Sequence, residues 1–321
     1  MRYAVKGKGK GGEVYSCDKV QMLFRLRYTT AQELLDALAC TVWIEFDHWE
    51  SRRPGTYRNQ FSIKLDGGRS YWLGVGLNEY GKNKQGDNAK LEFNPNKVWP
   101  CRSLLWLLNM LRQRMRLLDG CVVKAWDLAV DIPAPREDFE LVKDARMYEE
   151  QAHSASNRTQ YVGARNQPGR CKLYNKQLES DLPEPLTRLE VTVDGLAGAP
   201  DVAAIWPRVY RRTGFQTGMD IARLNDTDRF IFATLLREPD RLRELGRRKA
   251  ARMRELLEKA GYVLEFDPAA YKPVRAWVAR LENGEYEPGP DRPAWEWTGW
   301  EDGAAPIVGG RDPFAKEVQE E

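Results

Sequence analysis

The sequence predicts an α+β fold: a mainly antiparallel sheet with helices on one face, followed by a helical C-terminal region. Short segments of alternating apolar and polar residues, separated by Gly, Asn and Asp clusters, fill most of the first 200 residues, and helical periodicity dominates from about residue 201. An order of strands, helix, strand, helix and strands is typical of helices packed on an antiparallel sheet. We expect an α+β domain over residues 1–200, a helical region over 201–282 and a weakly ordered tail over 283–321.

The first 120 residues contain two predicted helices among several predicted strands. Residues 30–39 begin with Thr30, and Glu33 follows three positions later, which is the capping-box pattern of a helix start. Residues 103–118 place leucines at helical spacing. The strands are expected at residues 19–28, 41–47, 57–65, 71–77 and 90–93.

The following residues predict a second set of strands and then helices. A helix is expected around residues 137–149, and residues 163–169 predict the turn between two antiparallel strands. Helical periodicity returns at 226–237 and 239–260, with Gly261 as a stop signal. The strands are expected at residues 122–132, 159–163, 170–176 and 187–193.

Composition excludes several classes of protein. The chain has 321 residues, of which 42% are hydrophobic, and contains no apolar run of 18 residues. Because its first residues also lack the apolar core of a signal peptide, we expect a cytoplasmic protein with no membrane partner. Five scattered cysteines without a CxxC pair argue against a disulfide framework and a zinc cluster. With two histidines only, any metal would be held mainly by carboxylates.

Basic charge gathers in one segment although the net charge is only +3. Residues 241–260 hold eight Lys or Arg against three Glu. Clustered basic charge favours a polyanionic partner, most often nucleic acid, although the same pattern also fits a solvated helix face. The candidates for DNA contact are Arg247, Arg248, Lys249 and Arg252.

The segment 170–176 carries the side chains that suggest chemistry. On a strand, side chains alternate between faces, so Lys172, Tyr174 and Lys176 are expected on one face. A tyrosine between two lysines could attack a phosphate, because the positive charges favour the phenolate and neutralise the phosphate. The alternative is an amphipathic edge strand without chemistry.

Acidic residues occupy the polar faces of two other apolar strands. Asp127 and Asp131 share one face of their strand, and Glu190 shares a face with Arg188. Carboxylates on the polar face of otherwise buried strands are what a hard cation needs. Asp131 could instead cap the turn before a proline, and Glu92 could form a structural pair with Arg188.

Five segments, in order, resemble a known family. They are Lys90-Leu91-Glu92-Phe93-Asn94-Pro95-Asn96-Lys97, Trp126-Asp127-Leu128-Ala129-Val130-Asp131, Tyr161-Val162-Gly163-Ala164-Arg165, Leu173-Tyr174-Asn175-Lys176 and Arg188-Leu189-Glu190-Val191. Together they are similar to the trans-acting replication initiators of rolling-circle plasmids from Gram-positive bacteria, which are related to relaxases of conjugative elements and to initiators of some filamentous phages. The resemblance covers roughly residues 15–260.

The resemblance implies a site-specific DNA nickase and ligase. Such initiators recognise a double-strand origin, nick one strand through a tyrosine and stay attached to the 5′ phosphate, leaving a 3′ hydroxyl that primes synthesis. They look like distant relatives of the two-histidine nucleases, with carboxylates in place of the histidines. The position of the family's nucleophile is Tyr174 here, assisted by Lys172 and Lys176.

The resemblance also implies a metal and further partners. Mg²⁺ or Mn²⁺ is expected on Asp127 and Glu190 first, with Asp131 and Glu92 next. Arg165 is expected to clamp the scissile phosphate, or else to lie at the hairpin turn, and a DNA contact is expected for Arg188. The partner is DNA, double-stranded at the origin and single-stranded at the nick, with a second copy of the chain and a host helicase as further expected partners.

Two other functions remain open on the sequence. A relaxase that starts conjugative transfer would use the same chemistry, and an origin-binding protein that has lost catalysis would keep only the DNA contacts. One departure from the family pattern is Ala125, which stands where relatives carry an arginine two places before the acid.

Overall fold

The computed structural model describes most of the chain up to residue 285. The described residues are 3–26, 31–41, 43–65, 68–78, 85–115, 121–154, 156–165, 167–196, 202–211, 224–237, 239–260 and 264–285. Within them, the fold is α+β with mainly antiparallel strands, as predicted. No helix among these residues is both long and apolar enough to cross a membrane.

The chain divides into two compact units that are discontinuous in sequence. The first unit comprises Met1–Ala4, Lys19–Lys124 and Ala279–Glu321, and the second comprises Val5–Asp18 and Ala125–Val278. Both units therefore include residues from beyond position 200. The three-part division at residues 200 and 282 stays a prediction.

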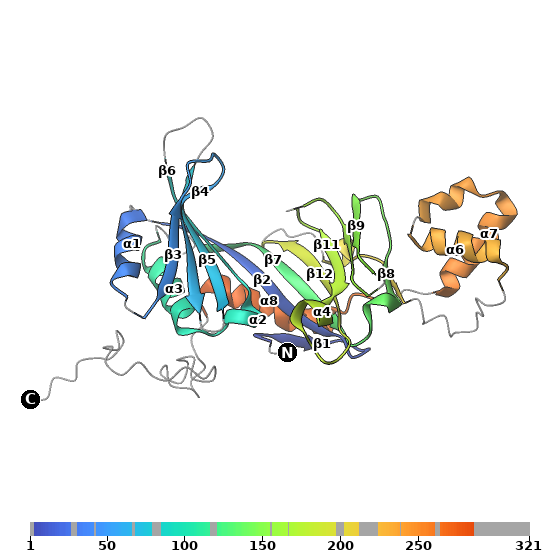
Figure 1. Cartoon of the computed structure of the whole chain (residues 1–321), viewed down its shortest axis with the longest axis horizontal. Helices are drawn as coiled ribbons and strands as arrows, with labels where there is room; N and C mark the ends of the chain where they lie inside the picture. The colour runs from blue at the N-terminus through green and yellow to red at the C-terminus, as the bar shows by residue number, and fades with distance from the viewer. Residues whose placement is uncertain are drawn as a thin grey trace, which may run out of the picture. The chain divides into compact units, whose positions relative to one another are not determined.

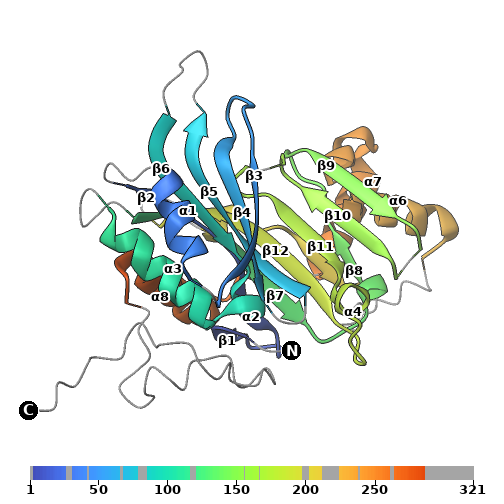
Figure 2. The same cartoon turned by 60° about the vertical axis from the view of Figure 1, so that its left-hand side comes forward.

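The first unit is a sheet with helices along one face. Its strands are antiparallel and run in the order β3-β4-β5-β6-β2. Phe61, Leu73 and Leu91 point to the apolar face, where each is fully buried. Helices α1 and α3 lie along the unit's sheet in both views (Figures 1 and 2). The elements are β2 (Val14–Arg25), α1 (Ala31–Ala39), β3 (Glu45–Glu50), β4 (Tyr57–Leu65), β5 (Arg69–Asn78), β6 (Gln85–Phe93), α2 (Pro95–Val98) and α3 (Arg102–Gln113).

The second unit carries a sheet in the order β7-β12-β11-β10-β9, again antiparallel. Trp126, Leu128 and Val130 of β7, and Leu189 and Val191 of β12, are buried on the apolar side that the sequence predicts. The elements are β1 (Lys6–Lys8), β7 (Cys121–Ile132), η2 (Arg136–Asp138), β8 (Phe139–Leu141), β9 (Tyr148–Ala152), β10 (Arg158–Val162), β11 (Cys171–Asn175), α4 (Lys176–Ser180), β12 (Thr187–Asp194), α5 (Val202–Ile205) and β13 (Val209–Arg211). Strands β8 and β13 pair separately.

Helices follow in the same unit and pack around a small apolar cluster. The helix predicted over 226–237 is α6 (Asp226–Arg237), whereas the segment predicted as one helix over 239–260 divides into η4 (Pro239–Glu244) and α7 (Arg247–Ala260). The last helix, α8 (Pro268–Asn283), runs from this unit into the first. The cluster is formed by Val142, Leu224, Phe232, Leu235, Met253 and Leu256.

The helix predicted over 137–149 is wrong. Strands β8 and β9 occupy this range instead. The cause is a contact that local sequence does not reveal: Glu140 is buried and accepts hydrogen bonds from Arg158 Nη1 at 2.7 Å and Nη2 at 2.6 Å. Gln160 also donates to Glu140 at 3.0 Å, so side chains of β10 hold this segment extended.

The predicted tyrosine strand is two residues too long, one at each end, because it begins at Cys171 rather than Arg170. It ends at Asn175, and Lys176 is the first residue of α4. Several sequence predictions fall outside the described residues: the cap at Thr30, the strand end at 27–28, the helix end at 116–118, Asn166 of the turn, the stop at Gly261 and the tail beyond residue 285.

Candidate active site

Strand register in the second unit assembles one polar face from three neighbouring strands. Tyr174 of β11 lies opposite Arg188 of β12, and Arg188 lies opposite Asp131 of β7. Two residues along the same strands, Lys172 of β11 lies opposite Glu190 of β12. Because side chains alternate with a period of two, these five residues share one face. The alternation in the sequence therefore predicts this face, and the register supplies its neighbours.

Tyr174 is held by a carboxylate and covered by a lysine. Its hydroxyl donates to Glu190 Oε1 at 2.6 Å and lies 3.3 Å from Glu179 Oε2. The ammonium of Lys172 stands 3.6 Å from the centre of the tyrosine ring, and that of Lys176 stands 5.9 Å away. Both predicted lysines are therefore near the tyrosine, although the residue itself is only 4% exposed.

The asparagine after the tyrosine fixes the start of a short helix. Asn175 Oδ1 accepts a hydrogen bond from Leu178 N at 2.9 Å, which is an N-cap, and Asn175 Nδ2 donates to Ser156 O at 2.9 Å. The first turn of α4 then carries Lys176 and Glu179, which form an ion pair beside the tyrosine. The Tyr-Asn-Lys sequence thus places a nucleophile candidate, a helix cap and a cation in succession.

Burial and like charge perturb the pKa of the two hydrogen-bonded groups. The pKa of Tyr174 is raised far above that of a free phenol, first by burial and then by the nearby charge of Glu190. Burial also raises the pKa of Glu190 to about 7, against an opposing effect of Lys172; Asp18 and Asp127 raise it further by like charge. Lys172 Nζ lies 3.9 Å from Glu190 Oε2. As it stands, the site keeps Tyr174 protonated and makes Glu190 unusually basic.

Arg188 has a structural role in place of the expected DNA contact. Its side chain is 0% exposed, and its Nε and Nη2 donate to the two carboxylate oxygens of Asp131 at 2.6 and 2.8 Å. Its Nη1 donates to Asp18 Oδ1 at 2.6 Å. A guanidinium buried in this way cannot reach a phosphate, and both oxygens of Asp131 are engaged. The expectations of Arg188 as a DNA contact and of Asp131 as a metal ligand do not fit this geometry, and Asp131 pairs with Arg188 rather than standing as a metal ligand or turn cap.

The four expected metal ligands do not form one group. Asp127 accepts a hydrogen bond from Thr192 Oγ1 at 2.8 Å, and Glu190 is bonded to Tyr174. Glu92, expected as a ligand or as a partner of Arg188, pairs in the first unit with Lys19 at 2.5 Å and Lys90 at 3.2 Å. Nowhere in the described part of the chain do three His, Cys, Asp or Glu side chains come together as a metal site. The expected metal therefore stays a prediction, with Asp127 and Glu190 as its remaining candidate ligands.

Arg165 lies after β10, in the turn that joins β10 to β11. This is the hairpin-turn position that the sequence offers as the alternative to a phosphate clamp. Its Nη2 donates to Glu149 of β9 at 3.1 Å, and its side chain is 68% exposed. A pair this exposed contributes little to stability and can exchange its carboxylate for a phosphate. The position is therefore compatible with a DNA contact without showing one.

Two of the four basic candidates on α7 are bound internally. Lys249 and Arg252 both pair with the buried carboxylate of Asp228 on α6, Arg252 at 3.1 Å. Arg247 and Arg248 are exposed at the start of the helix. Only the latter two present their charge outward without a hydrogen bond or ion pair among the described residues.

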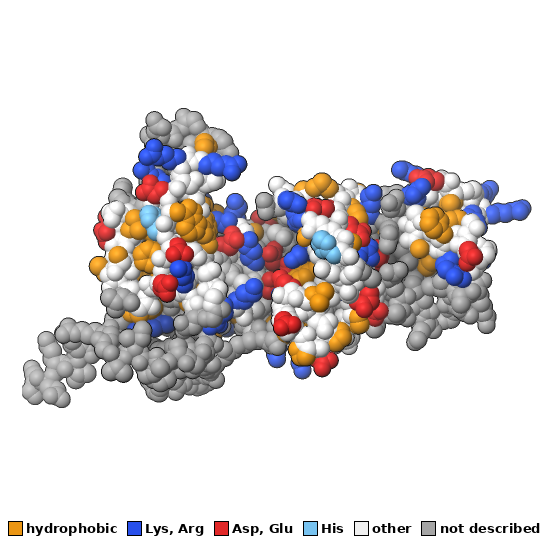
Figure 3. Space-filling model, viewed as in Figure 1, with side chains coloured by type: hydrophobic (Ala, Val, Ile, Leu, Met, Phe, Trp, Pro, Cys, Tyr) orange, Lys and Arg blue, Asp and Glu red, His pale blue; other side chains and the backbone are white. Residues whose placement is uncertain are grey.

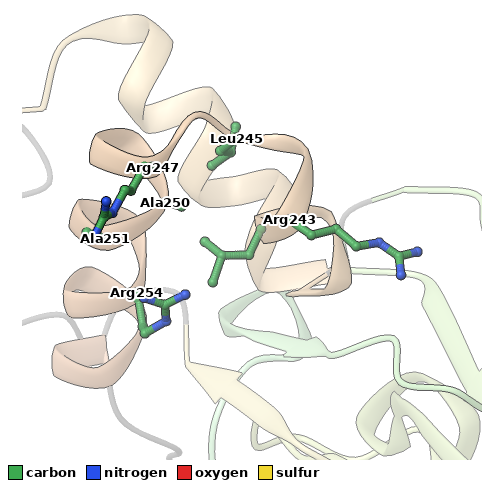
Figure 4. A pocket seen from close by; sticks show the side chains of 7 residues that line it. Arg243, Leu245, Arg247, Ala250, Ala251 and Arg254 are labelled. Carbon is green, nitrogen blue, oxygen red and sulfur yellow. The ribbon is translucent and has the colours of Figure 1, made fainter.

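The short helix η4 and helix α7 also form an open hollow of about 600 Å³. Its lining comes from η4 and α7, with leucine and alanine side chains between arginines. Figure 4 shows Arg243 extending outward, away from α7. The lining residues are Leu242, Arg243, Leu245, Arg247, Ala250, Ala251 and Arg254.

Two residues of the site escaped the sequence interpretation. Glu179 approaches the tyrosine because the cap at Asn175 turns the chain into α4, and an Asn followed by helix formers was the available signal. Asp18 pairs with Arg188 from a strand 170 residues earlier in the chain. Its only signal is that it is the one acidic residue of β2.

Comparison with known proteins gives a weak structural similarity and no sequence match. No protein-family model matches the chain, and no curated protein sequence matches it. A solved structure of a rolling circle replication initiator protein from Geobacillus stearothermophilus aligns over 57% of this chain and 75% of its own, with 11% identity and a TM-score of 0.32. The case for function therefore rests on the motifs and geometry of this chain.

Proposed function

We propose that the chain is a rolling-circle replication initiator that nicks one strand of its origin DNA through Tyr174 and later rejoins it. The observation that carries the proposal is the hydrogen bond of 2.6 Å from Tyr174 to Glu190, with Lys172 over the ring, inside a Tyr-Asn-Lys motif. Four further segments that resemble the same initiators surround this motif in the expected order.

The arrangement supports a transesterification with balanced proton transfer. Glu190 takes the phenolic proton as Tyr174 Oη attacks phosphorus, so that an O–P bond forms while the bond from phosphorus to the 3′ oxygen breaks. The 3′ oxygen leaves and takes up a proton from water as a hydroxyl, and the 5′ phosphate stays on the tyrosine. Rejoining reverses each step, and protonated Glu190 returns the proton to the phenol.

Lys172 supplies charge where the substrate would enter. Its side chain is 31% exposed and lies over the tyrosine ring, so an incoming phosphate meets this ammonium first. Movement of Lys172 from the ring to the phosphate would uncover the side chain of Tyr174 and, at the same time, neutralise the negative charge of the transition state. Lys176, paired with Glu179 and buried, keeps a second positive charge nearby.

Metal dependence stays a prediction. Asp127 and Glu190 lie on neighbouring strands and are the candidate ligands for Mg²⁺ or Mn²⁺, whereas Asp131 is engaged by Arg188. Because the described carboxylates do not form a metal group, no step of the scheme above uses one.

The decisive experiment uses supercoiled DNA carrying the origin of the chain's own replicon, with Mg²⁺, with Mn²⁺ and with EDTA. We expect open circles with protein covalently bound at the 5′ end, and loss of both products in Tyr174→Phe. Tyr161→Phe is the matched control, because Tyr161 lies on the neighbouring strand opposite Lys172. Nicking that persists in Tyr174→Phe would exclude this nucleophile.

The same experiment separates the other two functions. Cleavage confined to a transfer origin would favour a relaxase. Salt-sensitive origin binding without any nick, unchanged in Tyr174→Phe, would favour an origin-binding protein without catalysis.

A further inference from the structure

The first unit presents a second sheet face that the nicking scheme does not use. Strand register places Trp49 of β3 opposite Gln60 of β4, Gln60 opposite Gly74 of β5, and Gly74 opposite Lys90 of β6. These residues alternate with the buried core residues of the same strands, so they lie on the other side of the sheet. This row, with its neighbours Trp72 and Arg58, is called the Gly74 face below.

Aromatic rings lie over a bare stretch of backbone on the Gly74 face. The rings of Tyr57 and Trp72 meet edge to face with centres 5.6 Å apart. A Cβ at Gly74 would lie 2.4 Å from Trp72 and 2.6 Å from Tyr57, so only glycine leaves room for both rings. Beside them, Trp49 is 41% exposed, an unusual exposure for so large an apolar side chain.

Positive charge accompanies these rings. The ammonium of Lys90 lies 5.8 Å from the centre of the Trp72 ring. Arg58 follows Tyr57 directly on β4 and makes no ion pair among the described residues. Figure 3 shows hydrophobic side chains exposed over β3 to β5 with Lys and Arg near them.

The acidic residues of the same sheet face are paired with lysines. Lys64 pairs with Glu45 at 3.3 Å and with Asp47 at 2.9 Å, one or two rows away from Gly74. Glu92 is shared by Lys19 and Lys90. Together with Arg58, these three lysines stand against three carboxylates, so the net charge of the group is +1, which suits a polyanion.

We propose that the Gly74 face binds single-stranded DNA, with bases stacked on Trp49 and Trp72 and phosphates held by Arg58 and Lys90. Stacking requires open base faces, which a duplex hides, and it tolerates any sequence because every base has a π-face. Cations beside the exposed rings then bind the phosphates of the DNA strand. The choice of DNA over RNA rests on the proposed function, because nicking and strand displacement produce a single strand of DNA.

The test measures equilibrium binding of a fluorescent oligo-dT to the full chain carrying Tyr174→Phe, so that no cleavage interferes. Trp49→Ala should weaken binding about 5- to 150-fold, which corresponds to the loss of one stacked base at about 1–3 kcal/mol. Arg58→Gln should lower the slope of log K against log salt by about 0.7, as expected for one phosphate contact to a single strand.

A matched control is Trp43→Ala, since Trp43 packs against Trp106 and stands 4.6 Å from Arg102 elsewhere in the first unit. It should leave oligo-dT binding unchanged, with circular dichroism confirming that both variants are folded. Trp72→Leu is the second variant and should also weaken binding.

Three outcomes would overturn the proposal: unchanged binding in Trp49→Ala and Trp72→Leu, equal losses in the Trp43→Ala control, or tighter binding of the matching RNA. Failure of the nicking experiment does not decide this one, because binding is measured with a protein that cannot nick. Loss of oligo-dT binding in Trp49→Ala would stand even where Tyr174 proved inert.

Discussion

Replacing Glu190 by Gln should make the protein more stable at neutral pH. It should also remove the loss of stability that the wild type shows as pH rises from 4.5 through about 7. Glu190 is buried, with its side chain 14% exposed, and its pKa is raised from 4.5 to about 7. At about 1.4 kcal/mol per pKa unit, this rise amounts to about 3 kcal/mol. Gln keeps an oxygen that can accept the hydrogen bond from Tyr174 and carries no charge at any pH.

The raised pKa of Glu190 determines how the stability of the protein changes with pH. Because the folded state holds the Glu190 proton more tightly than the unfolded state, the stabilising contribution is complete below pH 4.5 and disappears as pH rises through about 7. Glu190→Gln should therefore match the wild-type free energy of unfolding near pH 4.5 and exceed it by up to about 3 kcal/mol at pH 8.

Urea denaturation at half-unit pH steps from 4.5 to 8, in EDTA, measures both proteins under the same conditions. Glu179→Gln is the control, since burial alone would raise the pKa of Glu179 but its bond to Lys176 lowers it, so this variant should be less stable than the wild type by a nearly constant amount above about pH 5.5. A constant difference between wild type and Glu190→Gln across this range would refute the assignment of a raised pKa.

Three further predictions concern single side chains. Asp131→Ala should lower the free energy of unfolding by about 3–5 kcal/mol in urea denaturation, because it leaves the buried guanidinium of Arg188 without its bidentate partner; a loss below 1 kcal/mol would contradict this. Gly74→Ala should cost about 1–3 kcal/mol in the same assay, because two aromatic rings occupy the space of the added methyl group. In gel-shift titrations with duplex origin DNA at several salt concentrations, Arg247→Gln should reduce the salt slope by about one and Lys249→Gln by less, since Lys249 is paired with a buried carboxylate; equal reductions would argue against this distinction.

Local pattern was sufficient where the signal lay within one element. The strand over 57–65 and the helix over 226–237 have the predicted bounds, and alternation correctly placed Lys172 and Tyr174 side by side. These elements show a clear period of two or 3.6 and are bounded by turn residues or a cap, so few tertiary contacts are needed to define them.

Contacts between distant residues could not be predicted in the same way. Glu140 is acidic and sits in a segment with helical character, yet its pairing with Arg158 makes it part of a strand. Arg188 and Asp131 looked like groups free for chemistry because alternation shows which face a side chain takes but not which partner stands opposite. The register places Arg188 of β12 opposite Asp131 of the neighbouring strand β7, so the two side chains form a structural ion pair. The roles of Tyr174 and Glu190 remain predictions that the nicking experiment tests.

The pairing of Asp18 with Arg188 has a practical consequence for anyone who wishes to isolate the tyrosine site. A contiguous fragment from residue 125 to 278 would include the residues of β7, β11 and β12 around Tyr174 but would lack the carboxylate of Asp18, 170 positions before Arg188, which accepts a hydrogen bond from Arg188. Tyr15, on the same early segment, accepts a hydrogen bond from Asp267 N at 3.1 Å, so the missing segment contacts the fragment both near its middle, at Arg188, and near its C-terminal end. A minimal version should therefore join residues 5–18 to residue 125 through a designed linker, or supply them as a separate peptide that completes the unit.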